Sequence, residues 1–181
     1  MPPQWRMASF NPNQRISSHF YWAELTASQA AQRLGLDNTP SPAARANLQR
    51  LAEYLECVRL WLRSRPLIIS SGYRSPAVNK AVGGSLNSAH MSGLAVDFIC
   101  PDYGSPLTVM RAIEAAANNG VIPLQPFDQL IYEGTWVHLG LAELGVKPRM
   151  QVLEARFTAS APTRYIDASI TATTAKQTGA A

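Results

Sequence analysis

A chain of 181 residues is long enough to bury a full hydrophobic core, and its hydrophobic fraction of 46% is ordinary for a soluble globular protein. No apolar run approaches the roughly 20 residues of a membrane-spanning helix, and the first residues lack the apolar core of a secretory signal, so we expect no signal peptide. The net charge of +4 comes from scattered basic residues without interleaved aromatic ones, which argues against nucleic acid as a partner.

Two helices are expected in the first third of the chain. Thr26 or Ser28 can cap a short helix that ends at Gly35, and Ser41 followed by Pro42 is a typical start for a longer one. The longer helix carries apolar residues at helical spacing, namely Leu48, Leu51, Ala52, Leu55, Val58 and Leu62. One face of this helix should therefore pack on the core.

Short strands and two more helices follow, and the two helices begin at serine or proline and end at glycine. The expected strands are 67–71, 95–99, 129–132 and 136–141, and the expected helices are 76–82 and 105–120. This order of elements predicts an α+β domain with a small, mainly antiparallel sheet and flanking helices.

The composition changes beyond about residue 158. This segment is rich in Ala, Thr and Ser and carries few charges, which is typical of a linker or arm rather than a packed core. We therefore divide the chain into an N-terminal extension (1–15), a folded domain (16–157) and a C-terminal arm (158–181).

His90, Asp97 and His138 form a candidate metal site. The two histidines lie in the short apolar stretches SAHMSGLAVDF and GTWVHLGL, where an unpaired imidazole is costly to bury. Gly93 indicates a turn that can fold His90 back onto the strand of Asp97, and His138 is expected on a second strand beside them. Two imidazoles and one carboxylate suit zinc and leave its fourth position open for water, as in catalytic sites. Taken alone, His138 would more often be a core residue.

Three runs of the sequence resemble those of a known family. SSGYRSPAVNKAVGG, SAHMSGLAVDF and FDQLIYEGTWVHLGL are similar to motifs of the zinc D-alanyl-D-alanine carboxypeptidases and L-alanyl-D-glutamate endopeptidases, which cut peptidoglycan stem peptides. The resemblance covers residues 16–141, and the opening HFYWAELTASQAAQRLGLDNTPSPAARANLQRLAEYL is similar to that of the phage-encoded branch. It implies a hedgehog/D-Ala-D-Ala peptidase-like fold with zinc held on the sheet by His90, Asp97 and His138.

The same resemblance suggests two catalytic residues. Arg74 matches an arginine near the metal, where a guanidinium can bind a substrate carboxylate or a developing oxyanion; otherwise it is a surface turn residue. Many relatives carry an acidic base three residues before the last histidine, where this chain has Thr135, which cannot act as a base. Glu133, five residues before His138, is the candidate in its place, and its alternative role is that of an exposed strand-end residue.

Two hypotheses about function remain open. The first is a zinc peptidase that cuts peptidoglycan stem peptides, as an endolysin held in the host cytoplasm before release to the cell wall or as a virion-associated lysin. The second is a structural or assembly protein of a phage particle that retains the fold with little or no turnover. In either case the C-terminal arm is a candidate contact with other virion subunits. The sequence leaves open which peptide bond is cut.

Overall fold

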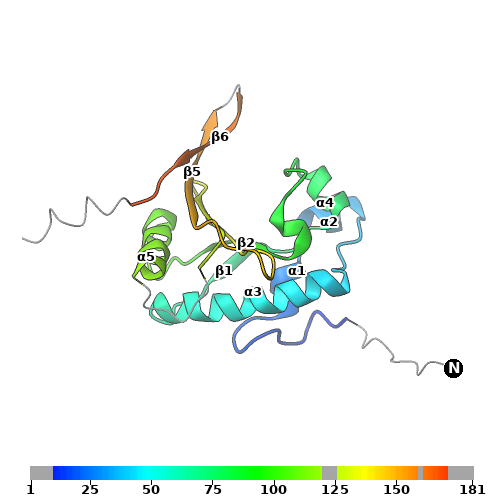
Figure 1. Cartoon of the computed structure of the whole chain (residues 1–181). Coiled ribbons are helices and arrows are strands. Elements are labelled where there is room, and N and C mark those ends of the chain that lie inside the picture. The colour runs from blue at the N-terminus through cyan, green and yellow to red at the C-terminus, as the bar shows by residue number, and fades with distance from the viewer. Residues whose placement is uncertain (1–9, 120–125, 159–160, 171–181) are drawn as a thin grey trace, which may run out of the picture.

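The computed structural model describes residues 10–119, 126–158 and 161–170. A six-stranded sheet with the order β1-β2-β4-β3-β5-β6 forms its centre (Figure 1). The strands are β1 (Ile68–Ser71), β2 (Ala95–Ile99), β3 (Gln129–Tyr132), β4 (Val137–Gly140), β5 (Gln151–Thr158) and β6 (Ala161–Asp167). Neighbouring strands are antiparallel except β3 and β5, which are parallel, so the predicted α+β fold with a mainly antiparallel sheet is confirmed.

Serine side chains fix the starts of four helices. The hydroxyl groups of Ser28, Ser41, Ser75 and Ser105 each accept a hydrogen bond from the backbone N–H three residues further on. The α-helices are α1 (Trp22–Thr26), α2 (Gln29–Leu34), α3 (Pro42–Trp61), α4 (Pro76–Ala81) and α5 (Pro106–Asn118), and η1 (Ala89–Ser92) is a 3₁₀ helix. Within the described ranges, no helix is long and apolar enough to cross a membrane.

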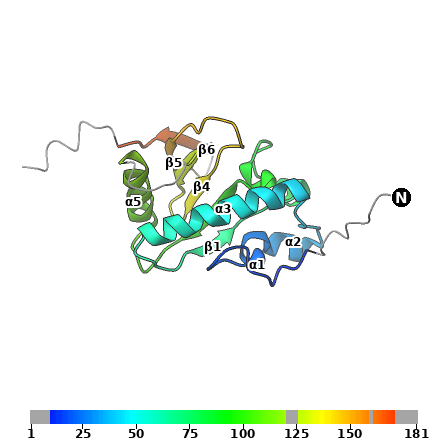
Figure 2. The ribbon, with the colours of Figure 1, turned by 60° about the horizontal axis from the view of Figure 1, so that its bottom comes forward.

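The core lies between the sheet and α3, which runs along one side of it (Figure 2). Val96 and Phe98 of β2 are fully buried in this core, together with Leu51 and Leu55 of α3. Because successive side chains of a strand point to opposite faces, Asp97 must point away from the core. The second face of the sheet is therefore free to carry polar side chains.

Most of the predicted elements are confirmed, including the long helix that starts at Ser41 and the strands that carry Asp97 and His138. Ser28, and not Thr26, caps α2, since Thr26 is the last residue of the unpredicted helix α1. The predicted helix end at Gly120 lies outside the described residues, as do residues 1–9 of the predicted extension and 159–160 and 171–181 of the predicted arm.

The β5–β6 hairpin was not predicted. Residues 161–167, which the composition assigned to a linker or arm, instead pair with β5 in an antiparallel register. The side chains of residues 163–167 are all exposed, so cross-strand backbone hydrogen bonds hold this strand rather than apolar burial. An exposed edge strand has none of the hydrophobic alternation by which a half-buried strand is recognised.

A buried carboxylate ties the end of the hairpin to α5. Glu114 is only 1% exposed and accepts hydrogen bonds from Arg111 Nη1 at 2.8 Å and from the backbone N–H of Ile170 at 2.6 Å. Arg111 also donates to the carbonyl of Ala168, whose own N–H donates to the carbonyl of Val152 in β5. The chain that leaves β6 is thus attached to the body of the domain.

We expect Glu114→Ala to destabilise the protein by about 1–3 kcal/mol, because the N–H of Ile170 and the guanidinium of Arg111 lose a buried partner. At this chain length the melting temperature should fall by about 2–12 °C. Hydrogen exchange should also become faster in β6. The exposed Glu143 offers the control Glu143→Ala, which should change neither quantity. Unchanged melting and exchange in Glu114→Ala would show that this carboxylate is not an anchor.

Candidate metal centre

Two of the three candidate ligands are paired across neighbouring strands. Asp97 in β2 and His138 in β4 are Cα partners in an antiparallel register, which places their side chains side by side on one face of the sheet. Both are buried, at 7% and 9% exposure. The flanking residues Val137 and Leu139 are fully buried in the core on the opposite face.

The third candidate, His90, reaches the sheet because the chain turns sharply before β2. Gly93 has a φ of +71°, a conformation that favours glycine, and a Cβ there would lie 2.6 Å from the carbonyl oxygen of Ala44. The N–H of Leu94 then donates to the carbonyl of Ala89, which folds η1 back onto the start of β2. His90 is 2% exposed, and its imidazole faces Asp97 and His138.

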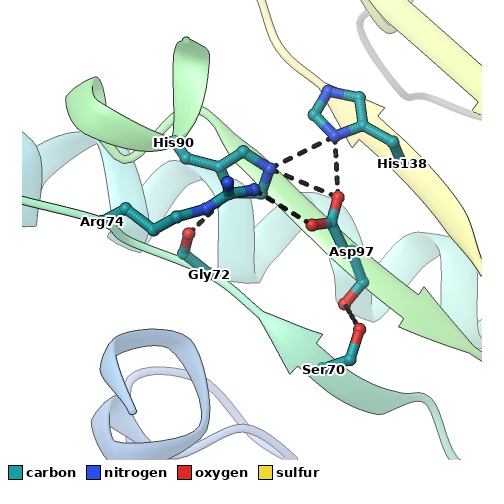
Figure 3. A network of polar contacts seen from close by, with 6 residues as sticks. All are labelled: Ser70, Gly72, Arg74, His90, Asp97 and His138. Carbon is teal, nitrogen blue, oxygen red and sulfur yellow. Dashed lines mark hydrogen bonds and ion pairs between the residues drawn. The ribbon is translucent and has the colours of Figure 1, made fainter. Parts of the chain in front are cut away.

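The three donor atoms converge on one point (Figure 3). His138 Nδ1 lies 2.8 Å from Asp97 Oδ1, and His90 Nε2 lies 3.2 Å from the same oxygen. The two nitrogens are 3.3 Å apart. Ligands that bind one zinc ion tetrahedrally at about 2.0–2.1 Å are about 3.3 Å from one another. The spacing of the donors therefore fits a single small cation.

A hydrogen bond to the backbone sets the tautomer of His90. Its Nδ1 lies 2.6 Å from the carbonyl oxygen of Gly72 and must donate to it, which leaves the lone pair of Nε2 directed at Asp97 and His138. Gly72 also lets α1 pack closely against this segment, because a Cβ there would lie 2.2 Å from the carbonyl oxygen of Leu25. The donor atoms of the three residues thus point lone pairs at one place, with too few protons between them to form hydrogen bonds to all of these lone pairs. A bound cation would interact favourably with all of them.

The electrostatics of the site favour ligands without protons. Burial raises the pKa of Asp97, but the neighbouring imidazoles of His138 and His90 more than offset this, and the resulting pKa is well below its ordinary value. Burial lowers the pKa of His90 and outweighs the opposing effect of Asp97. At neutral pH Asp97 is therefore a carboxylate and His90 a neutral imidazole, the forms that bind metals.

Arg74 contacts the site from the turn after β1. Its Nη2 donates to Asp97 Oδ2 at 3.2 Å, and its side chain is 18% exposed. The backbone N–H of Arg74 also donates to the carbonyl of His90, at 3.2 Å. This residue therefore holds the second oxygen of Asp97, a contact that the sequence did not predict. Its role toward a substrate stays a prediction.

Glu133 lies just after β3 and lines the same cleft as the three candidate ligands. It is half-buried, and burial together with the negative charge of Asp97 raises the pKa of its carboxyl above the ordinary value. Thr135 is exposed and belongs to the turn that connects β3 to β4. The structure thus brings Glu133 together with Arg74 and the metal site, while its catalytic role stays a prediction.

The cleft has a volume of about 680 Å³ and extends well beyond these residues. One wall is the loop between α4 and η1, which includes Gly84 and Ser88. The β5–β6 hairpin forms the opposite wall and contributes Phe157 and Tyr165. These two aromatic residues were not predicted as site residues, because they lie in the segment whose composition indicated the end of the domain and the arm.

A buried His–Asp–His group on a mainly antiparallel sheet, open to a cleft, is the arrangement of a catalytic metal site, in which three protein ligands leave one position open. The chain belongs to the peptidase M15 family, whose model matches residues 18–139. This is a family of zinc-dependent metallopeptidases, and the three candidate ligands all lie within the matched segment. No curated protein matches the chain significantly.

We expect His138→Ala to lose bound zinc, because a site with three protein ligands is left with two. The wild type should retain about one zinc ion per chain after dialysis, and the variant far less, as measured by elemental analysis. His19→Ala is a matched control, since His19 is exposed and contacts Glu56 instead. Equal zinc content in His138→Ala and the wild type would exclude His138 as a ligand.

Proposed function

We propose that this protein is a zinc peptidase that hydrolyses amide bonds in peptidoglycan stem peptides. The observation that carries the proposal is the convergence of three buried donor atoms at 2.8–3.3 Å in a cleft that also contains Arg74 and Glu133. Zinc held by His90, Asp97 and His138 would activate a water molecule and polarise the scissile carbonyl.

Glu133 acts as the general base in this proposal. Its raised pKa brings the carboxyl closer to neutral pH, where a group can both accept and return a proton. It would take a proton from the attacking water and deliver it to the amine of the leaving group. Thr135 cannot act as a base. Glu133, five residues before His138, therefore takes the role of the acid that many relatives place three residues before the last histidine.

Arg74 orients the site and binds substrate. One of its N–H groups holds Asp97 Oδ2, so that Oδ1 remains directed at the two imidazoles. The remaining donors of the guanidinium are available for a carboxylate of the substrate or for the oxyanion that develops as the amide is attacked.

The choice of peptidoglycan rests on the family motifs together with the charge of the chain. A net charge of +4 favours binding to an anionic wall polymer. We propose that the enzyme is a phage endolysin or a virion-associated lysin, which reaches the wall either from the host cytoplasm or on the particle.

A second candidate function is that of a virion structural protein with little or no turnover. Strand β6 favours it, because it is the edge of the sheet in the part of the chain that the structure describes, and the outer backbone groups of an edge strand can pair with a strand of another subunit. The two functions are compatible in a lysin that is carried on the virion.

Digestion of purified peptidoglycan tests the proposal. The zinc-loaded protein should release peptide fragments, a chelator should stop the release, and added zinc should restore it. The masses of the fragments identify the bond that is cut. An intact wall after incubation with zinc-loaded protein would contradict the peptidase and favour the structural function.

We expect Glu133→Gln to lower kcat by about 10²–10⁴-fold while zinc remains bound, because the base is lost and the ligands are kept. In the wild type, kcat/KM should fall with decreasing pH, because Glu133 becomes protonated and can no longer accept a proton. This acid limb of the pH profile should lie above the ordinary titration range of a glutamate, since the pKa of Glu133 is raised. The amide that replaces the carboxyl in the variant cannot titrate, so this limb should disappear from its pH profile.

Two control variants accompany this measurement. Glu143→Gln alters an exposed glutamate, and Thr135→Ala alters the position where many relatives have the acid; both should retain wild-type turnover. Near-wild-type kcat in Glu133→Gln would exclude Glu133 as the base.

A further inference from the structure

The β5–β6 hairpin lies outside the segment that the family model matches, yet it forms a wall of the cleft. Figure 1 shows it rising from the sheet on the side opposite α4. Its base is held by the contacts of Glu114 and Arg111 with residues 168–170. A wall that is attached at its base can offer a fixed surface to a substrate.

The registers of the strands show how this wall is joined to the metal site. His138 of β4 is paired with Ile131 of β3, and Ile131 with Leu153 of β5. These three side chains share one face of the sheet, and all of them line the cleft. On the next strand Tyr165 is paired with Ala155, two residues from Leu153 on the same face. The cleft therefore runs from the metal site across β3 and β5 to Tyr165.

The length of this path sets the size of a substrate that would fill it. From β4 to β6 there are three strand spacings of about 4.8 Å, or about 14 Å in all. An extended peptide advances about 3.3 Å per residue, so about four residues are needed to cover this distance. A peptide with only one or two residues beyond the scissile bond ends before it reaches Tyr165.

The chemistry along the path suits a peptide. Ile131 and Leu153 give an apolar floor, and beside them lie the amides of Gln129 and Gln151, which are joined by a hydrogen bond of 2.8 Å. Such amides can pair with a peptide backbone. At the far end Phe157 and Tyr165 are 58% and 53% exposed.

The two exposed aromatic side chains need an explanation, because large apolar groups that line one cleft are typical of binding sites. Tyr165 is also within the electrostatic reach of the catalytic residues. Partial burial raises the pKa of its phenol, and the negative charges of Glu133 and Asp97 raise it further. The hairpin and the catalytic residues therefore belong to one continuous surface.

We propose that the β5–β6 hairpin makes the enzyme select its substrates by length, with Tyr165 and Phe157 contacting the peptide about four residues from the scissile bond. The inference rests on the proposed peptidase function and extends it. It identifies the preferred substrate as an extended peptide that continues across the sheet on the hairpin side, and it gives the hairpin a function in substrate binding.

The test uses two series of synthetic peptides built around the bond that wall digestion identifies. One series is lengthened residue by residue toward the amino end and the other toward the carboxyl end. For the zinc-loaded wild type, kcat/KM should rise about tenfold in one of the two series when the third or fourth residue is added. A tenfold rise corresponds to the binding energy of about one aromatic contact. Tyr165→Ala and Phe157→Ala should reduce this rise and leave the rate on the shortest peptide unchanged.

Ile166→Ala is the matched control, because Ile166 is the neighbour of Tyr165 on β6 and points to the other face of the strand. It should keep the full dependence on length. An unchanged rate on the shortest peptide also shows that each variant is folded.

Three results would overturn the inference. The first is a wild type whose kcat/KM does not depend on length, and the second is a full dependence on length in Tyr165→Ala. The third is equal kcat/KM for the long peptide and for a short peptide that carries an attached disaccharide. That result would show that the hairpin binds the glycan and not the peptide. A wild type that cleaves no peptide at all would overturn the proposed function as well, so the two failures are distinguishable.

Discussion

The arrangement of the site depends on the cost of placing two imidazoles and a carboxylate side by side out of water. His90, Asp97 and His138 are each less than 10% exposed, and their donor atoms are 2.8–3.3 Å apart. Groups that all present electron pairs to one point are unfavourable there unless a cation or protons join them. The surroundings hold them in place nevertheless, with the carbonyl of Gly72 on His90 and the guanidinium of Arg74 on Asp97. A metal ion is a partner that satisfies all three groups at once.

The sheet supports such a site because its two faces have separate roles. Val96, Phe98, Val137 and Leu139 are fully buried against the core, and the residues between them, Asp97 and His138, point to the cleft. Rigid packing on one face thus fixes the side chains on the other, which a metal site needs if its ligands are to keep their geometry. The same face continues over β3 and β5 to β6, so that one surface carries both the catalytic residues and the proposed subsite for the substrate.

The sequence predicts the metal site better than its surroundings, and the reason is physical. His90 and Asp97 are linked by a short turn that contains Gly93, and His138 lies in a strand among apolar residues. Both features can be recognised from short stretches of sequence. The contact between Arg74 and Asp97 joins the turn after β1 to β2 and depends on how these two strands pair, which no local pattern encodes. Helix α1 is only five residues long, and the exposed strand β6 is held by backbone pairing. Neither produces the hydrophobic periodicity that identifies longer, buried elements.

The central claim is that His90, Asp97 and His138 bind one zinc ion through the atoms that converge in this structure. Diffraction from crystals grown with zinc, recorded on both sides of the zinc absorption edge, tests it most directly. The account predicts a single anomalous peak at about 2.0–2.2 Å from His90 Nε2, His138 Nδ1 and an oxygen of Asp97. No peak at this position, or a zinc ion held elsewhere while the three side chains keep their mutual contacts, would contradict it.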